Sequence, residues 1–318
     1  MKRIKTKLKD IITYENIVNA YFDSLKNKKN RAETFVVDLT LSTVLNSIYD
    51  ELSSGTYEVS PYCTFYISEP KERTILQPRF KDLIVQRIIY NAIYDEVDKR
   101  LFFHTYGVRK KRGMHICSRM AQKYIKEDTY YLQMDISKFF KSIDKEVFRE
   151  ILFRYFKDKD LIELMLKFFS EDDGVPIGNL LSGIFGLLYL TPLDKFIKEK
   201  LQVKHYLRFM DDFVLFNLTL EEAKRFRDEI TRYLEENLRL SLSKRLIQSS
   251  NKGLNFIGFR TYSHKRMLRK RTIKNFKNGN IDTRISILGM TLGTYSERFL
   301  RRKFNIPREL SLLKKTEE

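Results

Sequence analysis

Two adjacent carboxylates, Asp211 and Asp212, lie between the apolar segments LRFM and FVLF. Aromatic and β-branched residues on both sides of a short polar segment are typical of two strands joined by a tight turn. A third carboxylate, Asp135, ends the apolar segment YYLQM earlier in the chain. Because neighbouring strand ends meet in an antiparallel sheet, Asp135 can come to lie beside the turn. Three carboxylates gathered in this way could hold two Mg²⁺ ions and support phosphoryl transfer.

Each of these acids also has a purely structural explanation. An Asp-Asp pair suits the tip of a hairpin through turn chemistry alone. Asp135 could instead cap a helix that begins at SKFFKSI, a role worth about 1 kcal/mol. These residues and their flanks therefore leave both explanations open.

The surrounding segments show the periodicities of an α+β protein. The spacing of apolar residues predicts helices over 11–52 (a pair), 80–101, 220–238 and, after a Gly/Pro segment, through 200. Alternating patterns predict strands over 57–70, 129–135, 206–216 and 253–262. The pattern after residue 262 predicts helices, and this last part of the chain is very basic. Because there is no internal repeat or long linker, we expect subdomains of one body.

Basic residues recur along the whole chain. Sixty Lys and Arg stand against 41 Asp and Glu, which gives a formal net charge of +19. A folded chain with this excess and a pI near 9.7 suits a large polyanion. Nucleic acid is therefore the predicted partner.

Cysteines and histidines suggest no other metal chemistry. Cys63 and Cys117 form no CxxC pair, and the four histidines show no HxxxH spacing. Neither a disulfide framework nor a zinc site is therefore expected. The most apolar stretch, 183–190, is far shorter than the roughly 20 residues that span a bilayer. We predict a cytoplasmic protein without a membrane span.

Four segments resemble, in order and spacing, the motifs of reverse transcriptases. YLQMDISKFFKSID resembles motif A, GVPIGNLLSGIFGLLYLTPLDKF motif B, YLRFMDDFVLF motif C and GLNFIGFR motif E. Upstream, EPKERTILQPRFKDLIVQRIIYNAIY and HTYGVRKKRGMH resemble the fingers of the same family. The resemblance thus covers nearly the whole chain, to about Phe304.

The resemblance implies an α+β right-hand polymerase fold with fingers, a palm built on an antiparallel sheet, and a small helical thumb. The N-terminal helices and fingers would occupy 1–121. The palm, with the remaining fingers elements, would occupy 122–262, and the basic helical thumb and C-terminal tail 263–318.

For activity, the resemblance implies an RNA-directed DNA polymerase that makes cDNA by two-metal phosphoryl transfer. Asp135, Asp211 and Asp212 would be the catalytic carboxylates and would hold two Mg²⁺ ions, for which Mn²⁺ could substitute. The backbone carbonyl of Ile136 would complete a metal shell. Lys244 matches the motif D lysine that would protonate the leaving pyrophosphate.

Five further residues match positions that contact the incoming nucleotide. Arg73 and Arg109 would bind the triphosphate, because a guanidinium can hold phosphate oxygens bidentately; the alternative is a solvated basic face. Phe140 would exclude a ribose 2′-OH, whereas the alternative is a core phenylalanine, the role expected of its neighbour Phe139. Ile177 and Gly178 would lie beside the nucleotide as part of motif B.

The basic run after residue 263 resembles a thumb that grips the template–primer backbone. Its alternative is an exposed helix face. The residues predicted to bind nucleic acid are Lys265, Arg266, Arg269, Lys270, Arg271 and Lys274.

Within the family, the chain resembles bacterial and phage enzymes, and most of all those of diversity-generating retroelements, which are related to group II intron-like and antiviral-defence reverse transcriptases. Many family members have glutamine where this chain has Ile177, and an aliphatic residue there accompanies error-prone copying. Ser182-Gly183 and the absence of tryptophan depart from the retroelement pattern.

The implied partners are an RNA template, a DNA or RNA primer and deoxynucleoside triphosphates. A structured noncoding RNA, a small basic accessory protein and an oligomeric state are also compatible with the resemblance. An antiviral-defence reverse transcriptase that copies a dedicated noncoding RNA is the alternative role. A non-catalytic RNA-binding scaffold is the alternative from another class, and RNA-dependent RNA synthesis is a third alternative, against which Phe140 argues.

Overall fold

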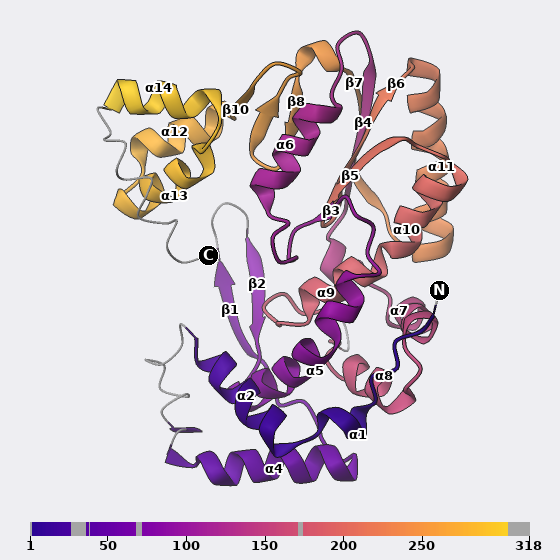
Figure 1. Ribbon diagram of the computed structural model, residues 1–318, viewed down its shortest axis with the longest axis vertical. Helices are drawn as coiled ribbons and strands as arrows, with labels where there is room; N and C mark the ends of the chain where they lie inside the picture. Colours follow the sequence, from indigo (N-terminus) through magenta and orange to yellow (C-terminus); the bar gives the residue numbers. More distant parts are fainter. Residues whose placement is uncertain (1, 27–35, 38, 68–71, 171–173, 305–318) are drawn as a thin grey trace. The chain divides into compact units, whose positions relative to one another are not determined.

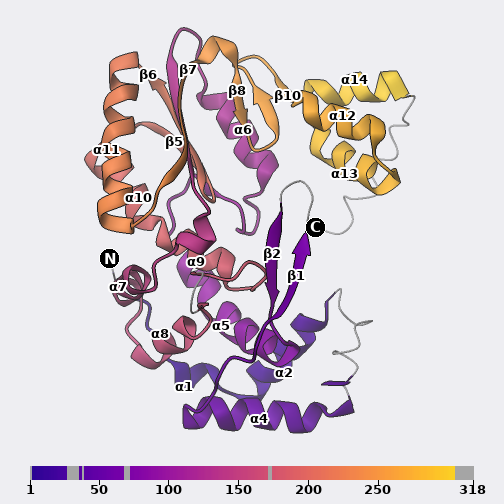
Figure 2. The same ribbon diagram turned by 180° about the vertical axis from the view of Figure 1, so that it is seen from behind.

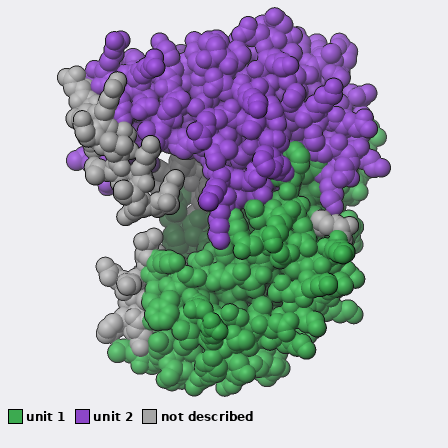
Figure 3. All heavy atoms as spheres, viewed as in Figure 1, with its two compact units in different colours: residues 1–102, 137–194, 232–241 green, residues 103–136, 195–231, 242–318 purple. Residues whose placement is uncertain are grey.

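The computed structural model describes residues 2–26, 36–37, 39–67, 72–170 and 174–304 (Figure 1). The chain divides into two compact units, each assembled from three separate segments (Figure 3). Unit 1 contains residues 1–102, 137–194 and 232–241, and unit 2 contains residues 103–136, 195–231 and 242–318.

Unit 1 is mainly helical. Its elements are α1 (Leu8–Ile11), α2 (Tyr14–Leu25), α4 (Leu41–Ser54), β1 (Cys63–Ile67), β2 (Arg73–Gln77), α5 (Phe80–Asp98), the 3-10 turn η1 (Phe139–Ser142), α7 (Lys145–Tyr155), α8 (Lys159–Leu166), α9 (Ser182–Tyr189) and α10 (Thr191–Lys195). Helix α5 lies at the centre, since Ile84, Val85, Ile89 and Ile93 are all fully buried. Its exposed positions, such as Asn91 and Asp95, are polar, as expected of a helix that packs its apolar side into a core. The antiparallel pair β1–β2 is its only sheet among the described residues.

The apolar helix predicted to run through residue 200 is interrupted. Two short helices, α9 and α10, are followed by a π-helical turn, Phe196–Lys200. Pro192 has no N–H to donate to the carbonyl of Leu188 four residues earlier. That carbonyl accepts from Thr191 Oγ1 instead, at 2.7 Å. The apolar pattern predicted the correct length of helical chain, and the proline divides it.

Unit 2 is built on a five-stranded sheet in the order β3-β5-β6-β4-β7. The strands are β3 (Thr105–Tyr106), β4 (Tyr130–Ile136), β5 (His205–Phe209), β6 (Asp212–Leu218) and β7 (Leu242–Ser249). All pairings are antiparallel except that of β3 with β5. Helix α6 (Met114–Tyr124) covers one face of this sheet (Figures 1 and 2). Its Cys117 and Ala121 are buried in one core with Tyr131 and Val214 of the sheet.

A smaller sheet and three helices complete unit 2. The sheet contains β8 (Leu254–Phe256), β9 (Phe259–Thr261) and β10 (Arg266–Leu268), and the helices are α12 (Lys270–Asn278), α13 (Ile281–Thr291) and α14 (Tyr295–Phe304). Helix α11 (Leu220–Leu238) runs from a unit 2 segment into a unit 1 segment. The predicted α+β class with an antiparallel sheet is confirmed. None of the described helices is long and apolar enough to cross a membrane.

Candidate active site

The two adjacent carboxylates lie at a hairpin in unit 2. Strands β5 and β6 are joined by the two-residue turn Met210–Asp211, so that Phe209 lies opposite Asp212. On the other side of β6, Asp212 is the register partner of Asp135 in β4. The structure therefore brings all three carboxylates to the same end of the sheet.

The turn is held by its neighbours. Met210 has a positive φ of 55°, as two-residue hairpin turns require at their first residue. Its N–H donates to the carbonyl of Tyr106 at 3.1 Å, and its own carbonyl accepts from Arg208 Nη1 at 3.1 Å. Gly107 leaves room for it, because a Cβ at that position would lie 2.9 Å from Met210 Cγ. A backbone bond to β3 and a side-chain bond from Arg208 in β5 thus fix the tip that carries the carboxylates.

Gln133 holds the carboxylate of Asp212. Residues 133 and 135 face the same side of β4 because side chains alternate along a strand. Gln133 Nε2 donates to both carboxylate oxygens of Asp212, at 3.0 and 3.3 Å, and its side chain is buried. Burial raises the pKa of Asp212 to about 7; the hydrogen bond from Gln133 and the charge of Lys244 act against this, whereas Asp135 adds to it. The pKa of the Asp212 carboxyl group thus lies near neutral pH, well above the ordinary range of an aspartate.

Asp135 is held from the other side by β7. The register of β4 against β7 shifts after Asp135, and Ser243 lies at this irregularity. Such a bulge re-aims a side chain. Ser243 Oγ donates to Asp135 Oδ2 at 2.5 Å and lies 3.2 Å from its carbonyl oxygen. Lys244 is the register partner of Asp135. Burial lowers the pKa of Lys244, and the negative charge of Asp212 acts against that shift.

Two further side chains complete the surroundings of Asp212. Burial lowers the pKa of Arg269, and the charge of Asp212 opposes this shift, so that the guanidinium and the carboxylate lie within electrostatic reach. Burial raises the pKa of Cys117 well above its usual value, with a smaller contribution from Asp212. The site is therefore bordered by two cationic side chains, Lys244 and Arg269, and by the α6 core.

The three carboxylates fit divalent cations by their chemistry. Carboxylate oxygens are the hard ligands that Mg²⁺ and similar ions take. Asp135 and Asp211 both raise the pKa of Asp212, which is the mark of crowded negative charge that a cation would relieve. Within the part of the chain that the structure describes, no three His, Cys, Asp or Glu side chains form a ready-made metal cluster.

The residues predicted to contact the nucleotide divide between the units. In unit 2, Arg109 is buried and its Nη1 donates to the carbonyl of Thr105 at 2.9 Å. Ile136 is also buried and ends β4 beside Asp135. In unit 1, Arg73 begins β2, and its side chain lies outside the described residues.

Phe140 and the motif B segment lie together in unit 1. Phe139 is buried and Phe140 half-buried, with ring centroids 5.3 Å apart. The carbonyl of Phe140 accepts from the N–H of Val175 at 2.8 Å, and the carbonyl of Ile177 accepts from the N–H of Leu76 in β2 at 2.9 Å. The segment between these bonds therefore links Phe140 in η1 to β2.

The residues predicted to bind nucleic acid after residue 263 differ in exposure. Lys270, Arg271 and Lys274 are exposed on α12. Lys265 lies over the ring of Tyr262, 5.3 Å from its centroid. The other two, Arg266 and Arg269, are more enclosed.

Arg266 has a structural environment. Its guanidinium donates to Gln122 Oε1, Ser118 Oγ and the carbonyl of Gly293, each at 3.0 Å. These partners belong to α6 and to the link between α13 and α14. Arg266 therefore ties the C-terminal helices to α6.

Sequence reasoning missed three residues that shape the site: Gln133, Ser243 and Arg208. Gln133 carries a signal in hindsight, because it lies two residues before Asp135 in a predicted strand and must share its face. Ser243 acts at the bulge of β7, and Arg208 acts at the Met210–Asp211 turn. The positions of both features depend on how the strands are paired.

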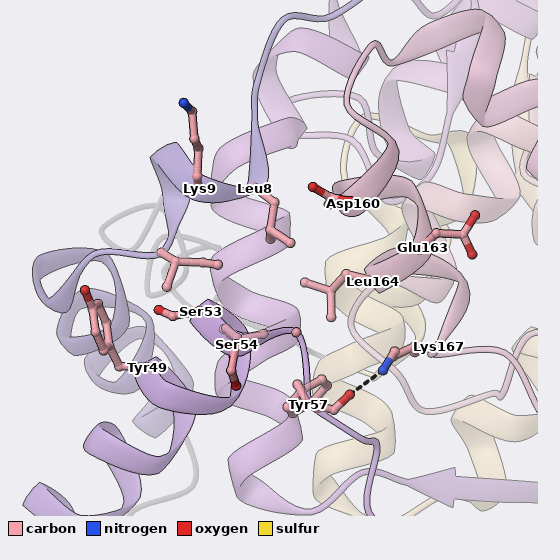
Figure 4. Close-up of a pocket in the computed structure, with 13 residues that line it drawn as sticks. Leu8, Lys9, Tyr49, Ser53, Ser54, Tyr57, Asp160, Glu163, Leu164 and Lys167 are labelled. Carbon is pink, nitrogen blue, oxygen red and sulfur yellow. Dashed lines mark hydrogen bonds between the residues drawn. The ribbon is translucent and has the colours of Figure 1, made fainter.

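A separate cavity of about 550 Å³ lies in unit 1 among α1, the end of α4 and α8 (Figure 4). Leu8, Tyr49 and Leu164 are among its lining residues, and Lys167 Nζ donates to the carbonyl of Tyr57 at its edge. None of the residues predicted for catalysis or nucleotide binding lines it.

One known family matches the central part of the chain. The family described as reverse transcriptase (RNA-dependent DNA polymerase) matches residues 68–261, more than half of the chain. The chain therefore belongs to the reverse transcriptase family, and its class is that of an RNA-directed DNA polymerase, a nucleotidyltransferase. Members of this family generally use divalent metal ions.

Individual relatives place it near group II intron-encoded enzymes. Protein YkfC of Escherichia coli (strain K12) is 25% identical over 284 residues, which cover 73% of each chain. Group II intron-encoded protein LtrA of Lactococcus lactis subsp. cremoris is 24% identical over 215 residues, which cover 61% of this chain and 35% of LtrA. The alignment thus spans about a third of the length of LtrA.

A solved telomerase shares the fold. The structure from Candida albicans, in complex with a TWJ fragment of telomeric RNA, superposes with a TM-score of 0.51 at 11% identity, over 80% of this chain and 57% of that one. At this identity the likeness concerns the fold alone. The right-hand polymerase fold implied by the sequence motifs is confirmed.

Proposed function

We propose that this protein copies an RNA template into cDNA by adding deoxynucleotides to a primer 3′-OH, with Asp135, Asp211 and Asp212 as its catalytic carboxylates. The observation that carries the proposal is the register pairing of Asp135 with Asp212 beside the Met210–Asp211 turn. Residues distant in sequence meet at one end of a sheet, with a lysine opposite. Two-metal phosphoryl transfer needs carboxylates gathered closely enough to hold two ions, and this pairing gathers them.

Mg²⁺ is the proposed ion. Asp135, Asp211 and Asp212, with the carbonyl of Ile136, would hold two ions, and Mn²⁺ could replace them. Bound ions would supply Lewis-acid activation of the primer hydroxyl and neutralise the triphosphate.

The side chains around the carboxylates have separate roles. Gln133 orients Asp212 and Ser243 orients Asp135 through the hydrogen bonds described above. Lys244, whose pKa burial lowers, lies opposite Asp135 and would donate a proton to the leaving pyrophosphate. Arg73 and Arg109 would bind phosphate oxygens.

Nucleotide choice belongs to unit 1 in this proposal. The ring of Phe140 would exclude a ribose 2′-OH and so select deoxynucleotides. Ile177 and Gly178 would border the base pair, and an aliphatic side chain at 177 offers no hydrogen bond to orient it. We therefore propose error-prone copying, as in diversity-generating retroelements. The fingers, palm and thumb would follow the boundaries 1–121, 122–262 and 263–318.

The test is primer extension on an RNA template with Mg²⁺, comparing deoxynucleotides with ribonucleotides. Wild type should extend with deoxynucleotides only, and Asp211→Ala with Asp212→Ala should abolish extension. Asp160→Ala, which removes an exposed acid outside the site, should not. Errors concentrated at template adenines would support the mutagenic role. A folded, RNA-binding wild type that stays inactive even with its native RNA would support a non-catalytic scaffold instead.

A further inference from the structure

We propose that Gln86 and Asn179, two buried amides of unit 1, are positioning residues that set how strictly the enzyme discriminates between nucleotides. They act by anchoring the motif B segment 174–180. This inference rests on the proposed function, in which Phe140, Ile177 and Gly178 face the nucleotide.

The segment 174–180 joins two walls of the proposed nucleotide site. At one end, the N–H of Val175 donates to the carbonyl of Phe140 at 2.8 Å. Further along, the N–H of Leu76 in β2 donates to the carbonyl of Ile177 at 2.9 Å. A shift of this segment would therefore move Phe140, which is proposed to face the sugar, and β2, which belongs to the proposed fingers, at the same time.

The segment packs closely against β2, which leaves it no space to shift towards that strand. Gly178 has a φ of +121°, and a Cβ there would lie 2.8 Å from the carbonyl oxygen of Leu76. Backbone therefore contacts backbone at this point, which only glycine permits. Ile177 adds no polar contact of its own, since its side chain is aliphatic. The backbone bonds to Phe140 and Leu76 and the bond from Ser182 Oγ to the carbonyl of Pro176, at 2.6 Å, hold residues 175–177. The end of the segment at Asn179 and Leu180 needs support from residues behind it.

Two amides supply that support. Gln86, fully buried in α5, donates from Nε2 to Asn179 Oδ1 at 3.1 Å, and its Oε1 accepts from the N–H of Leu180 at 2.8 Å. Asn179 Nδ2 donates in turn to the hydroxyl of Tyr62 at 2.9 Å. Each amide thus uses both its donor and its acceptor. The chain of bonds links α5, the motif B segment and the residues that lead into β1.

Such a network is sensitive to the loss of one member. Removing one amide leaves a buried partner unsatisfied, which is more costly than losing an exposed hydrogen bond. Because neither Gln86 nor Asn179 faces the substrate in this proposal, the effect would reach the reaction through the placement of Ile177 and Gly178. Loss of either amide should therefore change nucleotide selection more than it changes the rate of the chemical step.

The experiment compares Gln86→Leu, Asn179→Leu and the double variant with Ile93→Ala. Ile93→Ala is the matched control, since it truncates a fully buried side chain two turns further along α5 without touching the network. Steady-state insertion of correct and incorrect deoxynucleotides gives kcat and KM for each. Hydrogen exchange of residues 174–182 reports anchoring independently of activity.

We expect each Leu variant to raise KM for the correct nucleotide and to raise the misinsertion ratio about tenfold, the scale of one lost discriminating contact. Exchange should quicken in 174–182, and the double variant should be no worse than the more affected single variant, because both residues act through one link. Ile93→Ala should leave discrimination unchanged.

Equal discrimination in folded wild type and variants would overturn the inference while leaving the proposed function intact. An increase in misinsertion that Ile93→Ala reproduces would also overturn it, since general loosening of α5 would then suffice. A wild type without any extension would refute the proposed function itself, and this outcome is visible before any variant is made.

Discussion

Burial, together with the charges of its neighbours, sets the pKa of Asp212 in the carboxylate cluster. Asp212 lies opposite Asp135 in the sheet and next to Asp211 in the chain, and burial holds its pKa near 7. Gln133 and Lys244 act in the opposite direction by stabilising the ionised form. The state of Asp212 at neutral pH thus depends on individual neighbours, each of which can be removed separately.

Gln133→Leu should lower activity and move its pH dependence. Loss of the hydrogen bond raises the pKa of Asp212 further, so a higher pH is needed to ionise it. One charge-assisted hydrogen bond is worth about 1.5 to 3 kcal/mol, and the acidic limb of the rate profile should move upward by about one to two pH units. Primer extension across pH and Mg²⁺ concentration measures this. Gln248→Leu, a glutamine on β7 that has no contact with these carboxylates, is the control; an unmoved profile would contradict the role of Gln133.

Asp212 should also make metal-free stability depend on pH. Its pKa is higher in the folded protein than the value near 4 of an unfolded chain. The folded state therefore keeps a proton that the unfolded state has lost, so the contribution is greatest below about pH 4 and disappears as pH rises through 7. In EDTA, Asp212→Asn should be more stable than wild type at pH 8, by up to about 4 kcal/mol. The advantage should shrink toward pH 4.

Urea unfolding at several pH values measures this difference. Saturating Mg²⁺ should stabilise wild type at pH 8 more than the variant, because Asp212→Asn removes one of the three carboxylates proposed to hold the ions. A difference between the two proteins that does not change with pH would show that Asp212 titrates normally.

At the scale of elements, the strands that carry the acids could be predicted from sequence and their neighbours could not. The apolar flanks of Asp135 and Asp211 predicted β4 and the β5–β6 hairpin correctly. Strand β7 was missed because polar residues occupy many positions of LSKRLIQS, and it becomes a strand by pairing with β4. Ser243 meets Asp135 only through that pairing. Contacts set by register between distant segments leave no local pattern.

Gly107→Ala should disturb the catalytic hairpin from outside it. Gly107 has a φ of +83°, which is strained for alanine, and the new Cβ would meet Met210 Cγ at 2.9 Å. We expect a loss of about 1 to 3 kcal/mol in unfolding free energy and a larger loss of kcat than of KM, because the turn carries Asp211. Thermal unfolding and primer extension measure the two effects.

The matched control is Gly113→Ala. Gly113 lies in the same loop region and has a negative φ, and the methyl group of an alanine there would have open space around it. If both variants behaved alike, the effect would come from glycine loss in general and not from the contact with Met210.

At the scale of the whole molecule, the net charge of +19 raises the question of whether binding depends on total charge or on a particular surface. The exposed cations of α12 favour a particular surface. Replacing Lys270, Arg271 and Lys274 by alanine should weaken template–primer binding and flatten its salt dependence. Each lost phosphate contact should reduce the slope of log affinity against log salt by roughly 0.9.

The control removes the same three positive charges elsewhere, at the exposed residues Lys2, Lys5 and Lys7. Titration of a labelled template–primer at several salt concentrations distinguishes the variants. Equal slopes for both would mean that total charge governs binding, and α12 would then have no special part in it.

The two units are built from alternating segments of the chain, and this constrains the order in which they can form during synthesis. The chain passes between them at 102/103, 136/137, 194/195, 231/232 and 241/242. During synthesis, the five-stranded sheet lacks β7 until residue 249 has left the ribosome, and until then one side of β4, which bears Asp135, has no partner strand. The sheet that carries the carboxylates is therefore incomplete until β7 has been synthesised. No single cut separates the units into contiguous fragments, so a split version of this protein would have to reassemble strand by strand.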